Sequence, residues 1–363
     1  MSSSRTGTAA FVVLFFTIAL SITLACVGFI QNAPLPTTGD ESPATSSEAV
    51  SAKPQFTVGE AEYIPEPEPE PEPDPKPESL AYLATNSDIL SISSSKDPIS
   101  FALADGDSAP TLSDDASTSI TSTMTKLLGE ERVGGFLLID LETGRGVVSG
   151  ADERVFGASA IKAPFVHFMC ERWLDAGKAS LDDKVTIDDK EMTLKEAIED
   201  AVIKSGNDSY KMLFNTYNSG WSTWLQSMGI SGKIDPWERN PSYTARESAV
   251  MWLEIYRYIS EEASADNHAE WLGSMISSTQ VSFMRHAIAD NNTKVASKPG
   301  WYATPEGSEY KMDGFCEAGI INEDGHCYLL TLMTDVAYKG ALEDEFENVI
   351  QAIWAARSDF ATK

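Results

Sequence analysis

The chain has 363 residues and a formal net charge of −28 at pH 7, with 55 acidic residues against 27 lysines and arginines. This balance argues against nucleic acid as a partner, because nucleic-acid binding needs basic patches. Four cysteines in a chain of this length do not form a disulfide framework, and no histidine and cysteine spacing typical of a metal site is present. We therefore expect neither a metal ion nor a cofactor.

Residues 9–30 form an almost unbroken apolar run, "AAFVVLFFTIALSITLACVGFI". About 20 apolar residues are enough to cross a bilayer as a helix. Arg5 precedes the run, and the first charged residues after it are Asp40 and Glu41. This asymmetry favours a cytoplasmic N-terminus and an extracellular remainder. We therefore expect residues 1–31 to be a cytoplasmic tail and a transmembrane signal-anchor.

Two alternatives for the apolar run stay open. It could be a cleaved signal peptide, although it is long for one and lacks a clear small-residue cleavage site. It could also be a lipoprotein signal that ends at Cys26, although apolar residues continue after that cysteine as "VGFI". All three alternatives export the rest of the chain, which would be secreted if the run is cleaved and would otherwise face the cell wall from the membrane.

Residues 32–116 are predicted to be a disordered linker. The stretch "PEPEPEPEPDPKPE", residues 65–78, alternates proline with acidic residues and cannot form a core. Polyproline II geometry and charge repulsion make such a stretch an extended spacer. Residues 79–116 remain rich in serine and aspartate and weakly patterned. A stiff spacer beyond an anchor would hold a domain away from the bilayer, as a cell-wall-facing protein requires.

Residues 117–363 have the pattern of one folded domain. A helix in "SITSTMTKLLGEE" precedes a hairpin, "VGGFLLIDLETGRGVVSG", whose turn is at "ETGR". A helical region follows, then two strand segments, "NTKVASKPGW" and "GFCEAGIINEDGHCYLLTLMTD", and a last amphipathic helix. The helices are expected near residues 160–176, 194–204, 209–217, 221–229, 244–258 and 342–357, with two short helices before residue 291. This order predicts an α/β (α+β) fold, in which strands from both chain ends form an antiparallel sheet with helices packed on it and an all-helical lobe.

Cys316 and Cys327 flank the predicted turn "NEDG". A turn there would pair Cys327 with about Ile320 and leave Cys316 too distant for a disulfide bond. We therefore expect free buried thiols.

Ser159 and Lys162 are three residues apart at the start of an apolar predicted helix, "SAIKAPFV". Residues at i and i+3 lie on one helical face, so the Lys162 ammonium can reach the Ser159 hydroxyl. Apolar neighbours would lower the lysine pKa towards a value useful for proton abstraction, and a serine nucleophile needs such a base. The alternative is that Ser159 is a helix N-cap and Lys162 a solvated lysine.

Two further motifs change the balance between these alternatives. "SGN", residues 205–207, lies between two predicted helices, and "SKPGW", residues 297–301, lies on a predicted strand. The order SxxK, SxN, KxG resembles the penicillin-recognising serine hydrolases, the superfamily of class A β-lactamases and low-molecular-weight D,D-peptidases. The resemblance covers roughly residues 117–363. It implies a β-lactamase/transpeptidase-like fold and a serine hydrolase.

The resemblance also implies roles for individual residues. Ser159 would be the acylated nucleophile, Lys162 its base or proton relay, and Ser205 the group that passes a proton to the leaving group. The resemblance further implies four substrate-binding residues, namely Asn207, Lys298, Gly300 and Trp301.

Each of these four substrate-binding residues has its own implied contact. Asn207 would hold the substrate's amide carbonyl, and Lys298 would bring positive charge to the substrate carboxylate. Gly300 would let the strand approach the ligand closely. The backbone N–H groups of Ser159 and Trp301 would form the oxyanion hole.

The sequence departs from the superfamily pattern at two places. Pro299 stands between the lysine and the glycine, where the superfamily has a threonine or serine that binds the substrate carboxylate, and proline has neither a hydroxyl nor an N–H. Glu238, in "DPWER", is a candidate base for deacylation, but the next predicted helix follows too closely for the long loop of a class A β-lactamase. We leave Glu238 outside the predicted site.

Three functions are consistent with these motifs. The first is an exported serine acyl-enzyme hydrolase that acts on cell-wall (peptidoglycan) peptides or on a related amide or ester. The second is a β-lactamase, whose substrate would be a β-lactam-like small molecule. The third is a catalytically silent cell-wall-binding module of the same fold, which could tolerate Pro299 but would not need all of the other motif residues.

Overall fold

The structure is a computed structural model, and it describes residues 84–103, 108–230, 234–260, 263–264 and 266–360. The predicted anchor and the Pro/Glu-rich part of the predicted linker lie outside these residues. Within the described residues, no helix is both long and apolar enough to cross a membrane.

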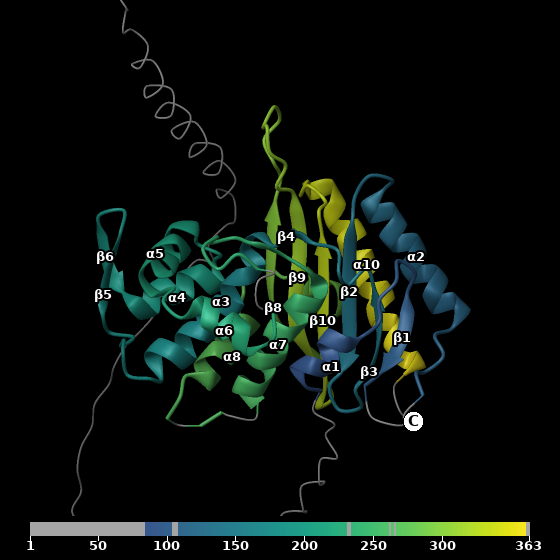
Figure 1. The fold of residues 1–363 in the computed structure, drawn as a ribbon, viewed down its shortest axis with the longest axis horizontal. Helices are drawn as coiled ribbons and strands as arrows, with labels where there is room; N and C mark the ends of the chain where they lie inside the picture. Colours follow the sequence, from purple (N-terminus) through teal and green to yellow (C-terminus); the bar gives the residue numbers. More distant parts are fainter. Residues whose placement is uncertain (1–83, 104–107, 231–233, 261–262, 265, 361–363) are drawn as a thin grey trace, which may run out of the picture. The chain divides into compact units, whose positions relative to one another are not determined.

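An antiparallel sheet of six strands is the centre of the fold (Figure 1). Its spatial order is β1-β3-β2-β10-β9-β8, so strands from the beginning and the end of the domain lie side by side. The strands are β1 (Ile99–Ala102), β2 (Gly134–Asp140), β3 (Arg145–Ser149), β8 (Thr293–Tyr302), β9 (Gly314–Glu323) and β10 (His326–Thr334). The predicted sheet is confirmed.

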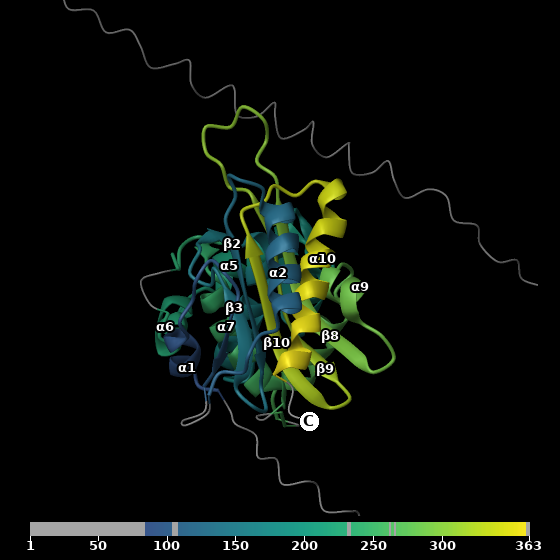
Figure 2. The same cartoon turned by 90° about the vertical axis from the view of Figure 1, so that its right-hand side faces the viewer.

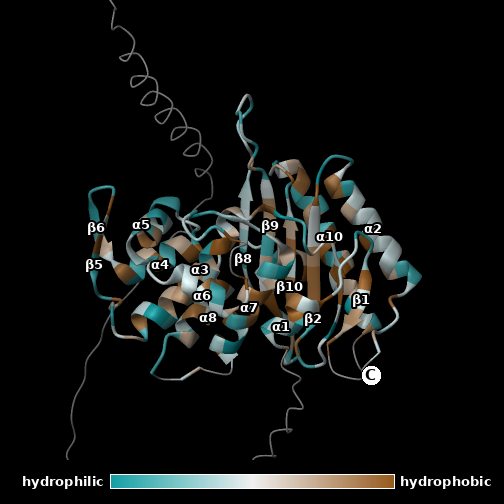
Figure 3. Cartoon of the chain, viewed as in Figure 1, coloured by the Kyte–Doolittle hydropathy of each residue, from teal (hydrophilic) through white to brown (hydrophobic). Residues whose placement is uncertain are grey.

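The central strands are apolar because both faces of the sheet are covered. Along β2, Phe136 and Leu138 belong to one hydrophobic core, whereas Leu137 and Ile139 belong to the other. Successive side chains of a strand point to opposite faces, which explains this division. Figure 3 shows the hydrophobic colour concentrated on these strands.

Helices from both chain ends cover one face of the sheet. They are α2 (Asp114–Leu128), α9 (Phe283–Ile288) and α10 (Glu343–Ala355), with the short 3-10 segments η3 (Gly340–Leu342) and η4 (Ala356–Asp359) flanking α10. Figure 2 shows α2 and α10 side by side on this face. At its centre, Phe346 of α10 stacks on Phe315 of β9 with ring centroids 3.9 Å apart.

The helical lobe packs beside the other face. It contains α3 (Lys162–Met169), α4 (Leu194–Ile203), α5 (Asn207–Tyr217), α6 (Trp221–Ser227), α7 (Ala245–Ser260) and α8 (Ala269–Ser277). The buried ring of Phe165 is its centre, with the rings of Tyr210, Phe214 and Trp221 at centroid distances of 5.6, 5.3 and 5.4 Å. Burial of these rings stabilises the lobe against the unfolded chain.

The structure contains two small sheets that the sequence did not predict. A hairpin of β5 (Lys184–Ile187) and β6 (Lys190–Thr193) projects from the lobe, and β4 (Val155–Phe156) pairs with β7 (Ser242–Tyr243) next to the six-stranded sheet. The hairpin turn consists of Asp188 and Asp189, both with positive φ. Because this turn contains no glycine, its sequence carried no sign of a hairpin. The prediction of an all-helical lobe was therefore incomplete.

Ordered structure begins earlier than the sequence analysis predicted. The serine-rich stretch assigned to the linker includes α1 (Asn86–Ser91) and β1, which forms one edge of the sheet. Ile89 and Phe101 are buried in the core shared by the sheet and the lobe. Both elements are short and depend on distant partners, so their local sequence carried little signal.

The cysteines agree with the expectation only in part, and the register of the last hairpin differs from it. Cys170 and Cys316 are buried free thiols, whereas the free thiol of Cys327 is only partly buried. Cys327 pairs with Asn322 rather than with Ile320, because the turn is the tight pair Asp324 and Gly325.

Candidate active site

Ser159 lies in a tight 3-10 turn, η1 (Ala158–Ile161), which leads directly into α3. The preceding Ala158 has φ of 46°, a conformation that is uncommon for a residue with a Cβ. A hydrogen bond from the Gly157 N–H to the Pro241 carbonyl, at 3.2 Å, holds the start of the turn in place. Such backbone strain persists only where the surroundings impose it, and it is concentrated at functional sites.

Lys162 begins α3, and its side chain is fully buried. Its Nζ donates to the Ser205 carbonyl oxygen at 2.7 Å and to Asn207 Oδ1 at 2.9 Å, with longer contacts of 3.4 Å to Ser205 Oγ and the Gly206 carbonyl. In the described part of the chain, none of its hydrogen bonds goes to Ser159. The lysine one turn after the serine is therefore oriented mainly by the SGN turn.

Burial makes this lysine easier to deprotonate. Loss of hydration, together with the positive charges of Lys298 and Arg239, lowers the pKa of Lys162 to about 7. A neutral amine can accept a proton, so an appreciable fraction of Lys162 is a competent base at neutral pH.

Ser205 connects the lobe to the sheet. It lies between α4 and α5 with φ of 61°, and its Oγ accepts a hydrogen bond from Lys298 Nζ of β8 at 3.0 Å. Lys298 is also buried, which lowers its pKa to about 7 although the charge of Glu317 opposes the shift. Two lysines from different elements thus converge on one serine.

Gly300 lets β8 lie against η1, the turn that contains Ser159. A Cβ at this position would lie 2.3 Å from the Ala160 nitrogen and 2.6 Å from the Ser159 nitrogen, which no side chain can accommodate. The glycine in the KxG motif is therefore required for the contact between β8 and η1.

Strand β8 is an edge strand, and its outer side faces η1. The Pro299 carbonyl accepts a hydrogen bond from Lys298 Nζ at 3.0 Å, so it points to this open side rather than to β9. Alternate residues of a strand direct their N–H and C=O groups to the same side. The Trp301 N–H consequently faces the side on which Ser159 lies.

A pocket of about 260 Å³ joins these groups. All of the predicted site residues line it except Lys162 and Gly300, which are buried. Its lining is formed by Ser159, Ile203, Lys204, Ser205, Asn207, Gln280, Val281, Lys298, Pro299 and Trp301.

Asp200 shapes the SGN turn and was not among the predicted site residues. Its backbone carbonyl accepts from the Gly206 N–H at 2.9 Å, and its Oδ2 accepts from the Ser209 hydroxyl at 2.6 Å. A Cβ at Gly206 would lie 1.8 Å from that same Oδ2. The glycine of "SGN" therefore reflects the position of Asp200, which no motif in the sequence identifies.

A buried carboxyl group behind β8 was also missed. Glu317 of β9 pairs in register with Pro299. It accepts hydrogen bonds from the Ser282 and Ser297 hydroxyls at 2.7 and 2.6 Å and from the Met284 N–H at 3.0 Å. Burial raises the pKa of Glu317.

Glu238 lies outside the pocket lining, and its side chain is exposed. Its N–H donates to the Asp235 carbonyl at 3.3 Å in a short turn before β7. The exposed side chain gives no support to a role in deacylation. No group of three or more metal-ligating side chains occurs among the described residues.

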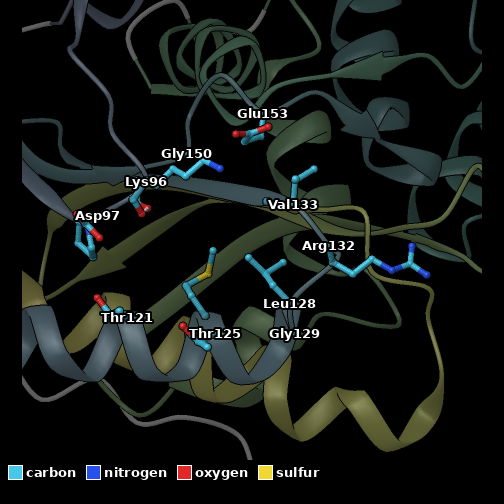
Figure 4. Close-up of a pocket in the computed structure, with 14 residues that line it drawn as sticks. Lys96, Asp97, Thr121, Thr125, Leu128, Gly129, Arg132, Val133, Gly150 and Glu153 are labelled. Atoms are coloured by element: carbon cyan, nitrogen blue, oxygen red, sulfur yellow. Dashed lines mark hydrogen bonds between the residues drawn. The ribbon is translucent and has the colours of Figure 1, made fainter.

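A second pocket of about 220 Å³ lies between α2 and the sheet, on the face away from the lobe (Figure 4). Lys96, Arg132 and Glu153 contribute charged groups to it. It contains none of the predicted site residues, so the pocket at Ser159 is the candidate active site.

The fold and the arrangement of its motifs define a serine hydrolase of the β-lactamase/transpeptidase type. A sequence model described as the Beta-lactamase enzyme family matches residues 119–356, which is more than half of the chain. The chain therefore belongs to this family, and the predicted resemblance, fold class and enzyme class are confirmed.

Solved structures show the same fold at low sequence identity. A β-lactamase from Chitinophaga pinensis is 17% identical with a TM-score of 0.56, and the match covers 69% of this chain and 100% of that one. A β-lactamase from Sphaerobacter thermophilus is 15% identical with a TM-score of 0.54, covering 66% and 97%. A PBP-A variant in an acyl-enzyme complex with penicillin G is 16% identical with a TM-score of 0.53, covering 66% and 97%. A search of curated protein sequences finds no match.

Proposed function

We propose that this chain is an exported, membrane-anchored serine hydrolase that forms an acyl-enzyme at Ser159 and acts on cell-wall peptides or on a related amide or ester. The observation that carries the proposal is the convergence of Lys162 Nζ and Lys298 Nζ on Ser205, in the pocket that Ser159 lines. Burying two lysines is costly for stability, and a module that only binds would not require it.

Acylation begins with proton transfer to Lys162. The neutral amine removes the proton from the Ser159 hydroxyl as Oγ bonds to the substrate's carbonyl carbon. The N–H groups of Ser159 and Trp301 then stabilise the negative charge on the carbonyl oxygen. The contact between β8 and η1 at Gly300 keeps these two donors close together.

Collapse of this intermediate requires a proton at the leaving group. The proton passes from Lys162 to Ser205 and from its hydroxyl to the leaving nitrogen or oxygen, while the bond between that atom and the carbonyl carbon breaks. The short path between the two lysines through Ser205 supports this relay. Lys298 holds the hydroxyl in place and compensates negative charge that develops on it.

Deacylation uses the same groups in reverse. Water attacks the ester carbon, its proton passes to Lys162, and the bond to Ser159 Oγ breaks as that oxygen regains a proton. In this step Lys162 activates the water, so the exposed Glu238 is not required as a base.

A β-lactamase activity is the alternative function. Membership of the β-lactamase family favours it, and a PBP-A variant with a similar fold has been solved as an acyl-enzyme complex with penicillin G. For this chain, Pro299 lowers the expected rate with β-lactams, which carry a carboxylate beside the reactive bond.

The proposal of a membrane anchor depends on the apolar run at residues 9–30 and on the Pro/Glu-rich spacer that follows it. These features support an extracellular enzyme that reaches its substrate at some distance from the bilayer.

Intact-mass spectrometry of the full chain tests the proposal. The chain is extracted from the membrane fraction of producing cells and incubated with a fluorophosphonate, with penicillin G and with a chromogenic cephalosporin. We expect one fluorophosphonate adduct, absent in Ser159→Ala, with a loss of labelling of at least about a thousandfold. A folded chain that no acylating probe modifies would refute the enzyme mechanism, and recovery only from the soluble fraction would refute the anchor. Rapid cephalosporin turnover would establish the β-lactamase alternative.

A further inference from the structure

The wall of the Ser159 pocket carries several apolar side chains, namely Ile203, Val281 and Pro299, together with the uncharged amide of Gln280. The leaving group accepts its proton from Ser205, so it lies in the same pocket as this wall. The Val281 side chain is 41% exposed and contributes an open apolar surface to this wall. The three apolar side chains cannot donate a hydrogen bond to an anion, and the Gln280 amide can donate one only as an uncharged group.

The cationic groups beside this wall already interact with acceptors inside the protein. Lys298 Nζ donates to Ser205 Oγ and to the Pro299 carbonyl, both at 3.0 Å. Lys162 Nζ donates to Ser205 and Asn207. The remaining lining cation, Lys204, has a mostly exposed side chain whose ammonium lies 3.5 Å from Asp200, so solvent and this carboxylate both weaken its attraction for an anion.

Burial weakens the attraction of the two lysines for an anion still further. Burial lowers the pKa of each to about 7, so their charged forms are less favoured than that of an exposed lysine. An attraction that must be shared with internal acceptors is a poor basis for recognising a carboxylate.

The residue that pairs with Pro299 on β9 does not supply the missing positive charge. Glu317 lies directly across from Pro299 on the adjacent strand, and paired residues place their side chains on the same face of a sheet. The group at this position is therefore a carboxyl held by the Ser282 and Ser297 hydroxyls. Its ionised form would repel an anionic leaving group.

We propose that the pocket selects acyl donors whose leaving group is uncharged, such as an interior peptide bond, a C-terminal amide or an ester, over donors with a free carboxylate next to the scissile bond. This inference rests on the proposed acyl-enzyme function. In the reaction, the Ser159 Oγ–carbon bond forms, the bond from carbon to the leaving nitrogen or oxygen breaks, and the serine proton ends on the leaving atom. Water then completes hydrolysis without any further reactant.

A matched pair of substrates tests this selectivity. One is an N-acylated D-Ala-D-Ala peptide with a free carboxylate, and the other is its C-terminal amide. We expect kcat/KM for cleavage of the last peptide bond to be higher for the amide by on the order of tenfold or more, because a carboxylate would lose hydration without gaining a charged hydrogen bond. Penicillin G and its methyl ester provide a second pair, in which acylation of Ser159 is followed by mass.

Two variants at one position separate the hydroxyl from the backbone. Pro299→Thr supplies both a hydroxyl and an N–H on the open side of β8, whereas Pro299→Ala supplies only the N–H. We expect Pro299→Thr to reduce the amide-to-carboxylate ratio about tenfold and Pro299→Ala to leave it within about threefold of the wild-type value. Circular dichroism spectra and thermal unfolding midpoints that match the wild type show that both variants are folded.

The outcomes separate this inference from the proposed function. A wild-type chain that labels with the fluorophosphonate but prefers the free carboxylate would overturn the inference and leave the acyl-enzyme function intact. An unchanged ratio in Pro299→Thr would also overturn it. A chain that fails to label at all would overturn the acyl-enzyme function itself, and the inference would be lost with it.

Discussion

The two sides of the sheet are built for different purposes. The side covered by α2 and α10 buries stacked and edge-to-face aromatic rings around Phe346. The pocket side buries the ammonium groups of Lys162 and Lys298 and holds Ala158 and Ser205 at positive φ. The first arrangement stabilises the fold, whereas the second reduces its stability. The difference indicates that the pocket is maintained for its chemistry, on a scaffold stabilised elsewhere.

Phe346→Ala tests the stabilising side and has the largest expected effect in this comparison. The side chain is fully buried between Phe315 and Phe283, so truncation should reduce the free energy of unfolding by about 3–5 kcal/mol. Denaturant unfolding measures the loss, and fluorophosphonate labelling of Ser159 per folded molecule should stay the same. A strong loss of labelling in the folded fraction would show that the two sides are coupled.

Gly300→Ala tests the contact between the sheet and the nucleophile turn. The new Cβ would force β8 away from the Ser159 and Ala160 nitrogens and misalign the oxyanion donors. We expect acylation to slow by about a hundredfold, measured as the rate of fluorophosphonate labelling. Gly340→Ala is the matched control, because a Cβ there meets no atom within 4 Å, and it should label at the wild-type rate.

The pH dependence of acylation tests the buried lysines. Protonated Lys162 cannot accept the serine proton, so the labelling rate should fall by up to about tenfold per pH unit below its pKa of about 7. The charge of Lys298 contributes to the lowered pKa of Lys162, so Lys298→Met should move the midpoint to higher pH. A flat profile, or a midpoint that moves to lower pH, would contradict the assignment of Lys162 as the base.

Much of the fold was predictable because its long elements carry strong patterns. The apolar strand β2, the hairpin turn after it and the amphipathic pattern of α10 all follow from local sequence. The elements that were missed are short. Strand β1 has four residues and forms only where β3 offers an edge, so its stability comes from pairing rather than from its own composition.

The predicted site residues lie together, but their contacts were not predictable. Spacing alone placed Lys162 near Ser159, whereas its closest hydrogen bonds go to Ser205 and Asn207, more than 40 positions along the chain. Asp200 and Glu317 were missed because a single carboxylate on a helix or strand resembles any other until the fold brings its partners together.

Pro299 has a consequence beyond the pocket. An edge strand offers a row of N–H and C=O groups to which a strand from another molecule can pair, and this is a common route to aggregation. Strand β8 is such an edge, but Pro299 removes one donor from the row and η1 covers the edge beside Gly300. The protein can therefore keep a substrate cleft open along the border of its sheet while limiting the extension of that sheet from one molecule to the next.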